Sequence, residues 1–154
     1  MPESSTTRWL RWKLNLFPAY RGMGARVDYI AADFREVRVH VSLSWRTRNY
    51  VGTIFGGSLY GALDPVYMIM LIKILGPDYV VWDKAATIRF RKPGRHTLYA
   101  TFVIDDAEIE AIKAATAAGD PVDRTLNVSL VDRDGVVHVS VEKVLYIRRM
   151  IRKP

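Results

Sequence analysis

The chain has 154 residues, of which 49% are hydrophobic and 25% are charged, and it contains no cysteine. This length and balance fit a single folded domain with a sizeable core and argue against a disordered chain. The absence of cysteine excludes disulfides, thiolate catalysis and cysteine-bound metals, and it is compatible with a reducing compartment.

The formal net charge is +7, and much of the positive charge lies near the two ends of the chain. A basic surface attracts polyanions, so an anionic small ligand, anionic lipid or nucleic acid could bind there. The same charge could simply keep the surface solvated. No nucleic-acid motif is present, so we expect no nucleic-acid partner. The basic residues are Arg8, Arg11, Lys13, Arg21 and Arg26 at the start, and Arg148, Arg149, Arg152 and Lys153 at the end.

Targeting signals are not evident in the sequence. No charged start leads into an apolar run with a small-residue cleavage site, so we expect no signal peptide. The longest uninterrupted apolar stretch, Pro65 to Ile72, is well short of the roughly 20 residues that a membrane span needs. We therefore expect a cytoplasmic protein.

Residues 1–24 are expected to form an extension before a main domain of residues 25–154. Residues 1–6 are expected to be disordered. Thr7 to Phe17 interleaves tryptophan and leucine with arginine and lysine, which predicts a short amphipathic helix. Such a helix could lie on a membrane surface. We favour a helix that docks through its tryptophans on the body of the protein or on a partner subunit.

Two strands are expected between Val27 and Leu43, where β-branched residues alternate with charged ones. A loop follows from Ser44 to Ile54. A hydrophobic helix is then expected from Gly56 to about Leu75, with Gly76-Pro77 ending it. Because this helix is apolar nearly all round, it should be buried on most sides.

The second half of the chain is expected to form mainly β-strands. Asp105 or Asp106 is expected to cap a further helix that ends before Gly119, and Asp134-Gly135 is typical of a hairpin turn. The short connections suit antiparallel pairing. The order of elements predicts an α+β fold in which an antiparallel sheet wraps around one long helix. The expected strands are Tyr79–Arg91, Thr97–Ile104, Arg124–Val131 and Val136–Ile147.

The segment from Asn49 to Asp64 carries most of the chemical information. Its glycines allow backbone N–H groups to approach a ligand closely, and a helix start leaves several N–H groups without partners. Such groups suit a developing oxyanion. Asp64 is a lone carboxylate in an apolar stretch and is therefore the candidate base. The Asp64-Pro65 pair could instead cap a helix segment, and the glycine pair could be a plain turn.

This segment resembles the hotdog-fold thioesterases of the phenylacetic-acid-pathway type. The matching positions are Asn49, Gly52, Gly56, Gly57 and Asp64. The runs Gly-Thr-Ile-Phe-Gly-Gly-Ser-Leu-Tyr, Tyr-Val-Val-Trp-Asp-Lys and Phe-Arg-Lys-Pro-Gly further resemble the DUF4442 family, over roughly residues 25–147. The resemblance implies a hotdog fold and hydrolysis of an acyl-thioester, usually acyl-coenzyme A (acyl-CoA). It implies no cofactor beyond the coenzyme A carried by the substrate.

The resemblance also implies residue roles. The carboxylate on the central helix, general base or nucleophile in that family, corresponds to Asp64. The oxyanion-binding amide at the helix start corresponds to Gly57, and Asn49 matches the asparagine that positions the water or the carboxylate. Asn49 could equally close its own loop with a hydrogen bond. One position departs from the pattern, because Phe55 replaces the histidine usual before the glycine pair and removes a polar group from the pocket.

Other residues are candidates for substrate binding. Asp83 lies where related thioesterases sometimes place a polar helper, although it could simply be a surface residue. Basic residues after it could hold coenzyme A phosphates, because guanidinium groups bind phosphate through two hydrogen bonds. They could also be a solvated strand end. No metal-ligand spacing is present. The substrate-binding candidates are Gly56, Phe55, Asp83, Arg91 and Lys92, with Arg89 and Arg95 as further basic residues.

The spacing of the two main candidates predicts an assembly. Gly57 and Asp64 share a helix face but lie roughly 10 Å apart along the axis. A reacting carbonyl needs both groups within about 3 Å, so we expect a homodimer or a dimer of dimers with interfacial sites. The alternative is a non-catalytic acyl- or lipid-binding module on the same fold. A hydratase is less favoured, because such enzymes rely on a histidine near the helix.

Overall fold

A computed structural model describes residues 1–151 of the chain; Arg152 and Lys153 of the basic C-terminus lie outside the described residues. The elements in chain order are α1 (Ser5–Leu16), α2 (Pro18–Gly22), β1 (Ala25–Ile30), β2 (Glu36–Val41), α3 (Gly56–Leu63), α4 (Val66–Leu75), β3 (Tyr79–Phe90), β4 (Leu98–Val103), α5 (Asp106–Ala115), β5 (Pro121–Val131) and β6 (Val137–Arg149).

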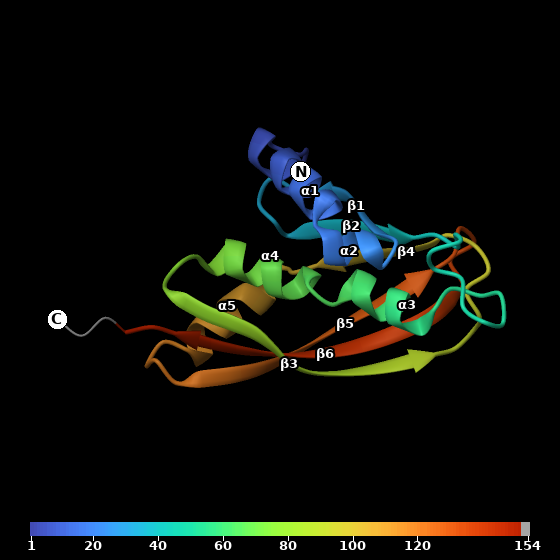
Figure 1. The fold of residues 1–154 in the computed structure, drawn as a ribbon. Coiled ribbons are helices and arrows are strands. Elements are labelled where there is room, and N and C mark those ends of the chain that lie inside the picture. The colour runs from blue at the N-terminus through green and yellow to red at the C-terminus, as the bar shows by residue number, and fades with distance from the viewer. Residues whose placement is uncertain (152–154) are drawn as a thin grey trace.

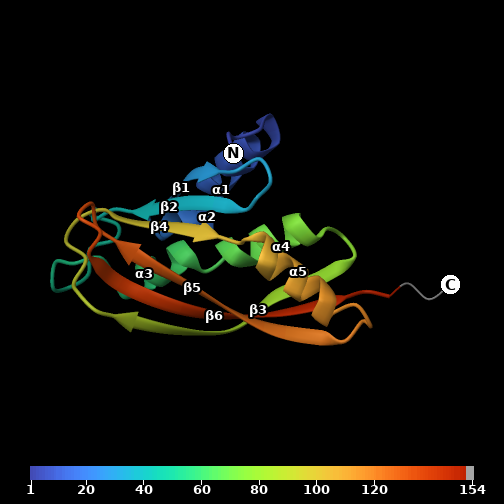
Figure 2. The same ribbon diagram turned by 180° about the vertical axis from the view of Figure 1, so that it is seen from behind.

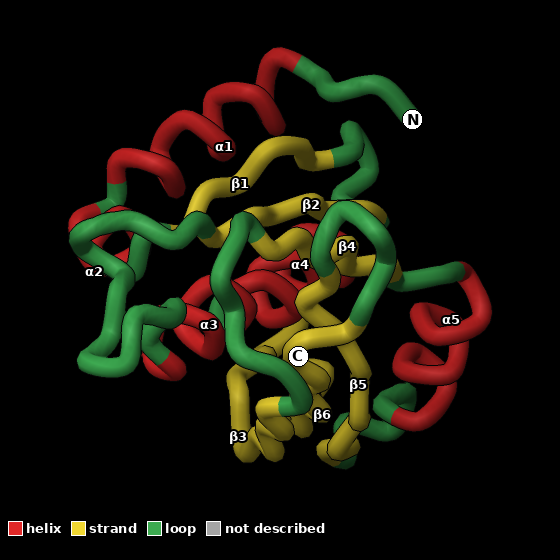
Figure 3. Tube along the Cα trace, turned by 90° about the vertical axis from the view of Figure 1, so that its right-hand side faces the viewer, coloured by secondary structure: helices red, strands yellow, loops and turns green. Residues whose placement is uncertain are grey.

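The six strands form one antiparallel sheet in the order β1-β2-β4-β5-β6-β3. The sheet curves so that α3 and α4 lie inside its concave face, as Figure 1 shows from the side and Figure 3 from the end. Strands β4 and β5 pair only at Tyr99 and Val131, and α5, which connects them, lies beside β5 (Figure 2). The expected α+β hotdog fold, with an antiparallel sheet around a central helix, is confirmed.

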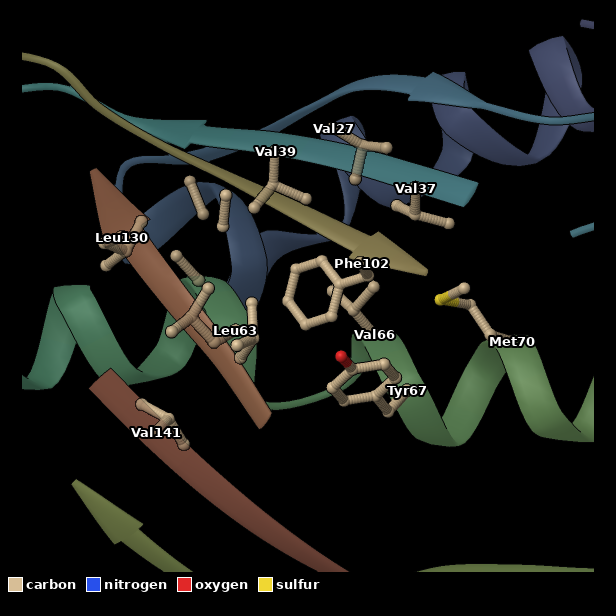
Figure 4. Packing of buried hydrophobic residues seen from close by; sticks show 14 of the residues in the cluster. Val27, Val37, Val39, Leu63, Val66, Tyr67, Met70, Phe102, Leu130 and Val141 are labelled. Carbon is tan, nitrogen blue, oxygen red and sulfur yellow. The ribbon is translucent and has the colours of Figure 1, made fainter. Parts of the chain in front are cut away.

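The core fills the space between the central helix and the sheet. Figure 4 shows valines of β1, β2 and β6 directed toward Leu63 and Met70, both of which are fully buried. Tyr67 packs edge-on against Phe102, with ring centroids 4.9 Å apart. The Tyr67 hydroxyl donates to the Asn127 carbonyl at 2.7 Å, so the polar end of this buried side chain is satisfied.

The central helix is interrupted at Asp64 and Pro65, because proline has no N–H to continue the hydrogen-bond ladder. By length and hydropathy the helical segment Gly56–Leu75 could cross a membrane, although its uninterrupted apolar run is shorter. In this fold the sheet wraps the segment, and Leu63, Met70 and Leu71 are fully buried. We therefore interpret it as a core helix, since core helices pass the same test.

The N-terminal extension is more structured than the sequence suggests. The Ser4 side chain caps α1 by accepting a hydrogen bond from Thr7 N at 3.1 Å. Glu3 pairs with Arg11 and accepts a hydrogen bond from Ile30 N at 3.0 Å. The expected disorder of residues 1–6 is therefore wrong from Glu3 onward, because local caps and contacts with β1 hold this part of the chain.

Helix α1 docks differently from our expectation. Trp9 and Trp12 are 57% and 61% exposed, whereas Leu10 and Leu14 pack against the core. Within the chain the helix therefore docks through its leucines and not through its tryptophans, and docking of the tryptophans on a partner subunit stays a prediction. The sequence also missed the short helix α2, which begins at Pro18 where a proline fits the first turn.

Candidate active site

The inward face of β6 carries a lysine among aliphatic residues. Val139, Val141, Leu145 and Ile147 point inward along the strand, and Lys143 takes the central position with a fully buried side chain. Burying an ammonium group is costly unless acceptors and opposite charges surround it. The neighbours of Lys143 therefore define a tightly constrained polar cluster at the edge of the core.

The Lys143 ammonium joins the central helix to β3. It donates to Asp64 Oδ1 and to the Asp64 carbonyl, both at 2.9 Å, and to the Tyr60 hydroxyl at 3.4 Å. It also lies 2.9 Å from Asp83 Oδ1. An ammonium has only three protons, so the four oxygens share them. Asp83 Oδ1 is buried and forms a close ion pair with Lys143.

The charges in this cluster control its protonation. Burial raises the pKa of Asp64, but hydrogen bonds from Lys143 and Tyr60 outweigh that effect and hold the pKa below its ordinary value. Burial lowers the pKa of Lys143, but Asp64 and Asp83 more than reverse this and raise it. Asp64 is therefore a carboxylate at neutral pH, paired with a charged lysine.

The pKa of Asp83 is shifted in the opposite direction from that of Asp64. Burial raises the pKa of Asp83, and contact with Lys143 offsets this only in part. Its side chain is turned toward Lys143, whereas that of the next residue, Lys84, reaches Asp123 with Nζ and Oδ2 2.6 Å apart. The two side chains diverge because neighbours on a strand point to opposite faces. Asp83, expected as a helper or a surface residue, is thus a mostly buried neighbour of Asp64.

Asp64 combines a fixed position with access to solvent. Its side chain is 45% exposed although its partner Lys143 is fully buried. Asp64 ends α3, and Pro65 precedes α4 without any side-chain cap. The carboxylate therefore does not cap the second helix segment, which was the alternative role suggested by the sequence. A fixed, ionised and accessible carboxylate can act as a general base or as a nucleophile.

The start of α3 presents two backbone N–H groups. Phe55 occupies the cap position without a side-chain hydrogen bond, and its carbonyl accepts from Ser58 and Leu59. The N–H groups of Gly56 and Gly57 have no backbone acceptor among the described residues. A Cβ on Gly57 would lie 2.4 Å from the Phe55 ring, so the ring covers Gly57 and would have to move aside for any larger residue there.

A groove of about 430 Å³ opens beside this helix start. It brings together the expected residues Gly56, Arg91 and Lys92 with Asn49 and Arg95. Asp64 does not line it. Arg89 lies in a separate hollow on β3, β5 and β6. The carboxylate thus lies outside the groove beside the helix start, in keeping with the separation along the helix that their sequence spacing predicts.

Asn49 uses its side chain to close its own loop. Its Oδ1 accepts hydrogen bonds from Thr53 N at 2.9 Å and Val51 N at 3.2 Å, and its Nδ2 donates to Thr53 Oγ1 at 2.9 Å. The sequence allowed either a catalytic or a loop-closing role for Asn49. The contacts in the structure are the ones that a loop-closing side chain makes. Asn49 thereby shapes the loop that leads into α3.

A family comparison covers most of the chain. The family DUF4442, described as a domain of unknown function, matches residues 7–147. The chain belongs to this family. No curated protein matches this DUF4442 chain.

Solved structures show the same fold at low sequence identity. A protein of unknown function from Pseudomonas aeruginosa, named a probable thioesterase, is 18% identical with a TM-score of 0.81, over 97% of this chain and 98% of that one. A protein of unknown function from Chlorobaculum tepidum is 15% identical with a TM-score of 0.74, over 94% of each chain. A thioesterase from Haemophilus influenzae is 11% identical with a TM-score of 0.67, over 97% and 95%.

Lys143 is the residue of this DUF4442 site that sequence reasoning missed. A signal was present, because a lysine stands where the alternation of β6 calls for an aliphatic residue. Its partners could not be read from the sequence, since Asp64 and Asp83 lie 79 and 60 residues away by residue number. Within residues 1–151, no three His, Asp or Glu side chains form a group that could hold a metal ion.

Proposed function

We propose that this DUF4442 protein hydrolyses an acyl-thioester of the acyl-CoA class, with Asp64 as general base or nucleophile. The observation that carries the proposal is the Asp64 carboxylate, half-exposed and held ionised by the buried Lys143. A base must be unprotonated and fixed close to the water that it activates. The names of similar folds support the same reaction, since two of them are called thioesterases.

The oxyanion in this proposal is bound by the Gly57 N–H group at the start of α3. Within one chain that group lies about 10 Å along the helix from Asp64, and Asp64 is not part of the groove beside Gly56. A second copy of the chain would therefore supply the Gly57 N–H that faces Asp64. The complete site is proposed to form at a homodimer interface.

Strand β3 supports this dimer. It is the last strand of the sheet and pairs only with β6, so its outer edge is free in the single chain. Residues 84–87 are exposed in succession, which means that neither face of this stretch is covered. A long free edge with open faces readily pairs with another strand. Pairing of two β3 edges would bring two copies of the central helix close together.

The basic residues of the groove fit the coenzyme A part of the substrate. Arg91, Lys92 and Arg95 lie beside the helix start. Arg91 donates through Nε to Ser140 Oγ at 2.9 Å, which orients the guanidinium and leaves its terminal nitrogens for phosphate. The phosphates would bind there, and the acyl-thioester would extend toward the interface.

The test is release of free thiol from acyl-CoA esters of increasing chain length. We expect wild-type turnover, and a loss of about 10²- to 10⁴-fold in Asp64→Asn and Asp64→Ala, the range typical of a missing general base. Glu110→Gln is the matched control, because that carboxylate pairs with Lys113 on the surface of α5. Circular dichroism checks the fold of each variant. Equal turnover in wild type and Asp64→Asn would exclude Asp64 as the catalyst.

A non-catalytic acyl-binding module is the second candidate, favoured by one observation. The Phe55 ring covers Gly57 where related thioesterases have a polar histidine. This candidate predicts no thiol release across the whole panel, together with acyl ligands that remain bound in native mass spectrometry. Turnover that depends on Asp64 would exclude it.

A further inference from the structure

Helix α1 has an outer face that the rest of the chain leaves uncovered. Figure 1 shows α1 at the outside of the molecule, on the far side of β1 from the central helix. Its exposed residues recur at helical spacing and so form one continuous stripe. The stripe consists of Arg8, Trp9, Trp12, Lys13, Leu16 and Phe17. Clustered exposed apolar side chains of this size commonly mark an interaction site.

The aromatic residues of this stripe do not attach the helix to the protein. The Asn15 side chain donates to the Val27 carbonyl at 2.9 Å and accepts from Val27 N at 2.8 Å. At the other end, Ile30 N donates to Glu3. These contacts satisfy the free edge of β1, and Leu10 and Leu14 cover the core. The two tryptophans are therefore free to contact something outside the chain.

Cations without a salt bridge in the described part of the chain surround the aromatic stripe, and one of them, Lys13, lies over the Trp9 ring at 3.5 Å from its centroid. Arg8, Lys13, Arg21 and Arg26 are exposed and form no salt bridge with the described residues. A hollow of about 490 Å³ is lined by three of these arginines together with Trp12 and Leu16. The partner of this surface must therefore be anionic and apolar at once.

We propose that α1 docks this protein on an anionic lipid bilayer. The helix lies in the plane of the surface, with Trp9, Trp12, Leu16 and Phe17 at the boundary of the acyl chains. Arg8, Arg21 and Arg26 bind lipid phosphates beside them. A second copy of the chain is a poorer partner, because a two-fold interface would place each set of cations against the same set. The proposal does not depend on thioesterase activity.

The test measures binding of the full-length protein to phosphatidylcholine vesicles with and without phosphatidylglycerol, by co-sedimentation. We expect binding to the anionic vesicles only, weakened by salt. Arg8→Gln with Arg26→Gln should weaken binding about fivefold for each arginine removed. Lys73→Gln with Lys113→Gln removes the same charge from α4 and α5 and should have little effect.

Trp9→Gln with Trp12→Gln tests the apolar half of the surface. We expect at least about a tenfold loss of binding, because two aromatic anchors no longer enter the interface. Trp45→Gln is the control, since Trp45 is an exposed tryptophan outside α1. Thermal unfolding confirms that each variant folds. The proposal is overturned by equal binding to neutral vesicles, by unchanged binding of the Trp9/Trp12 variant, or by no vesicle binding at all.

Discussion

At the scale of single residues, Lys143 connects three parts of the fold. It projects from β6, binds the carbonyl and the carboxylate of Asp64 at the break between α3 and α4, and faces Asp83 of β3. One buried cation thus fixes the place where proline interrupts the central helix. Because the same cation holds Asp64 ionised, the stability and the proposed chemistry of the site depend on one side chain.

Replacing Lys143 by methionine should destabilise the protein by about 2–3 kcal/mol at neutral pH, because two carboxylates lose their counter-charge. The loss should stay below that of a fully buried pair, since solvent reaches Asp64. Urea unfolding measures it. Lys113→Met is the matched control. Its surface pair with Glu110 should contribute less than about 1 kcal/mol.

The pH dependence separates charge from packing in the Lys143→Met variant. In wild type the lowered pKa of Asp64 adds stability above its ordinary pKa, and this is lost as pH falls through the lowered value. In the variant, burial raises the pKa of both carboxylates, so their charge costs stability at neutral pH. They therefore bind protons at a higher pH than a free aspartate does, and at about pH 4 the difference in stability from wild type should shrink. An equal difference at both pH values would indicate packing alone.

At the scale of elements, the two edge strands of the sheet differ in whether another part of the chain covers them. Strand β1 ends the sheet on one side, where Asn15 of α1 bonds Val27 and Glu3, just before α1, bonds Ile30. Strand β3 ends the other side and has no such cover in the single chain. One edge is thus protected within the chain, and the other is available to a partner.

Asn15→Ala should loosen α1 although alanine favours helix more than asparagine does. We expect a loss of about 1–2 kcal/mol, because two hydrogen bonds to Val27 disappear. Hydrogen exchange of the α1 amides should accelerate. Lys13→Ala, on the outer face of the same helix, serves as control and should leave exchange nearly unchanged. Unaltered exchange in Asn15→Ala would show that the two leucines alone hold the helix.

At the scale of the whole molecule, the proposed active site requires two chains. Within each chain the exposed carboxylate lies outside the groove beside the helix start. The exposed stretch of β3 is the surface that would join them. Because the monomer mass is 17.6 kDa, the proposed dimer is easily distinguished by analytical ultracentrifugation.

Ala85→Glu with Ala86→Glu should convert the dimer into a folded monomer, because four added carboxylates would repel one another along two adjoining β3 edges. Thioesterase activity should fall with dimer content. Ala111→Glu with Ala114→Glu adds the same charge to exposed positions of α5 and should keep the dimer. A wild-type protein that sediments as a monomer at all concentrations would contradict the interfacial site.

The sequence by itself determined the α+β class, the antiparallel strands and the buried central helix. These follow from local periodicity, since alternation in β5 and β6 and an apolar run after Gly56 each express one element and its buried face. The tertiary structure decided the partners of Lys143, the loop-closing contacts of Asn49 and the outward face of Trp9 and Trp12. The contacts of Lys143 and of α1 depend on which distant segments come together, and sequence periodicity holds no information about that. The contacts of Asn49 are local and depend on the conformation of its own loop. The sequence alone was thus enough to identify Asp64 as the candidate carboxylate. Lys143, whose charge keeps Asp64 ionised, was identified only from the packing of β6 against the central helix.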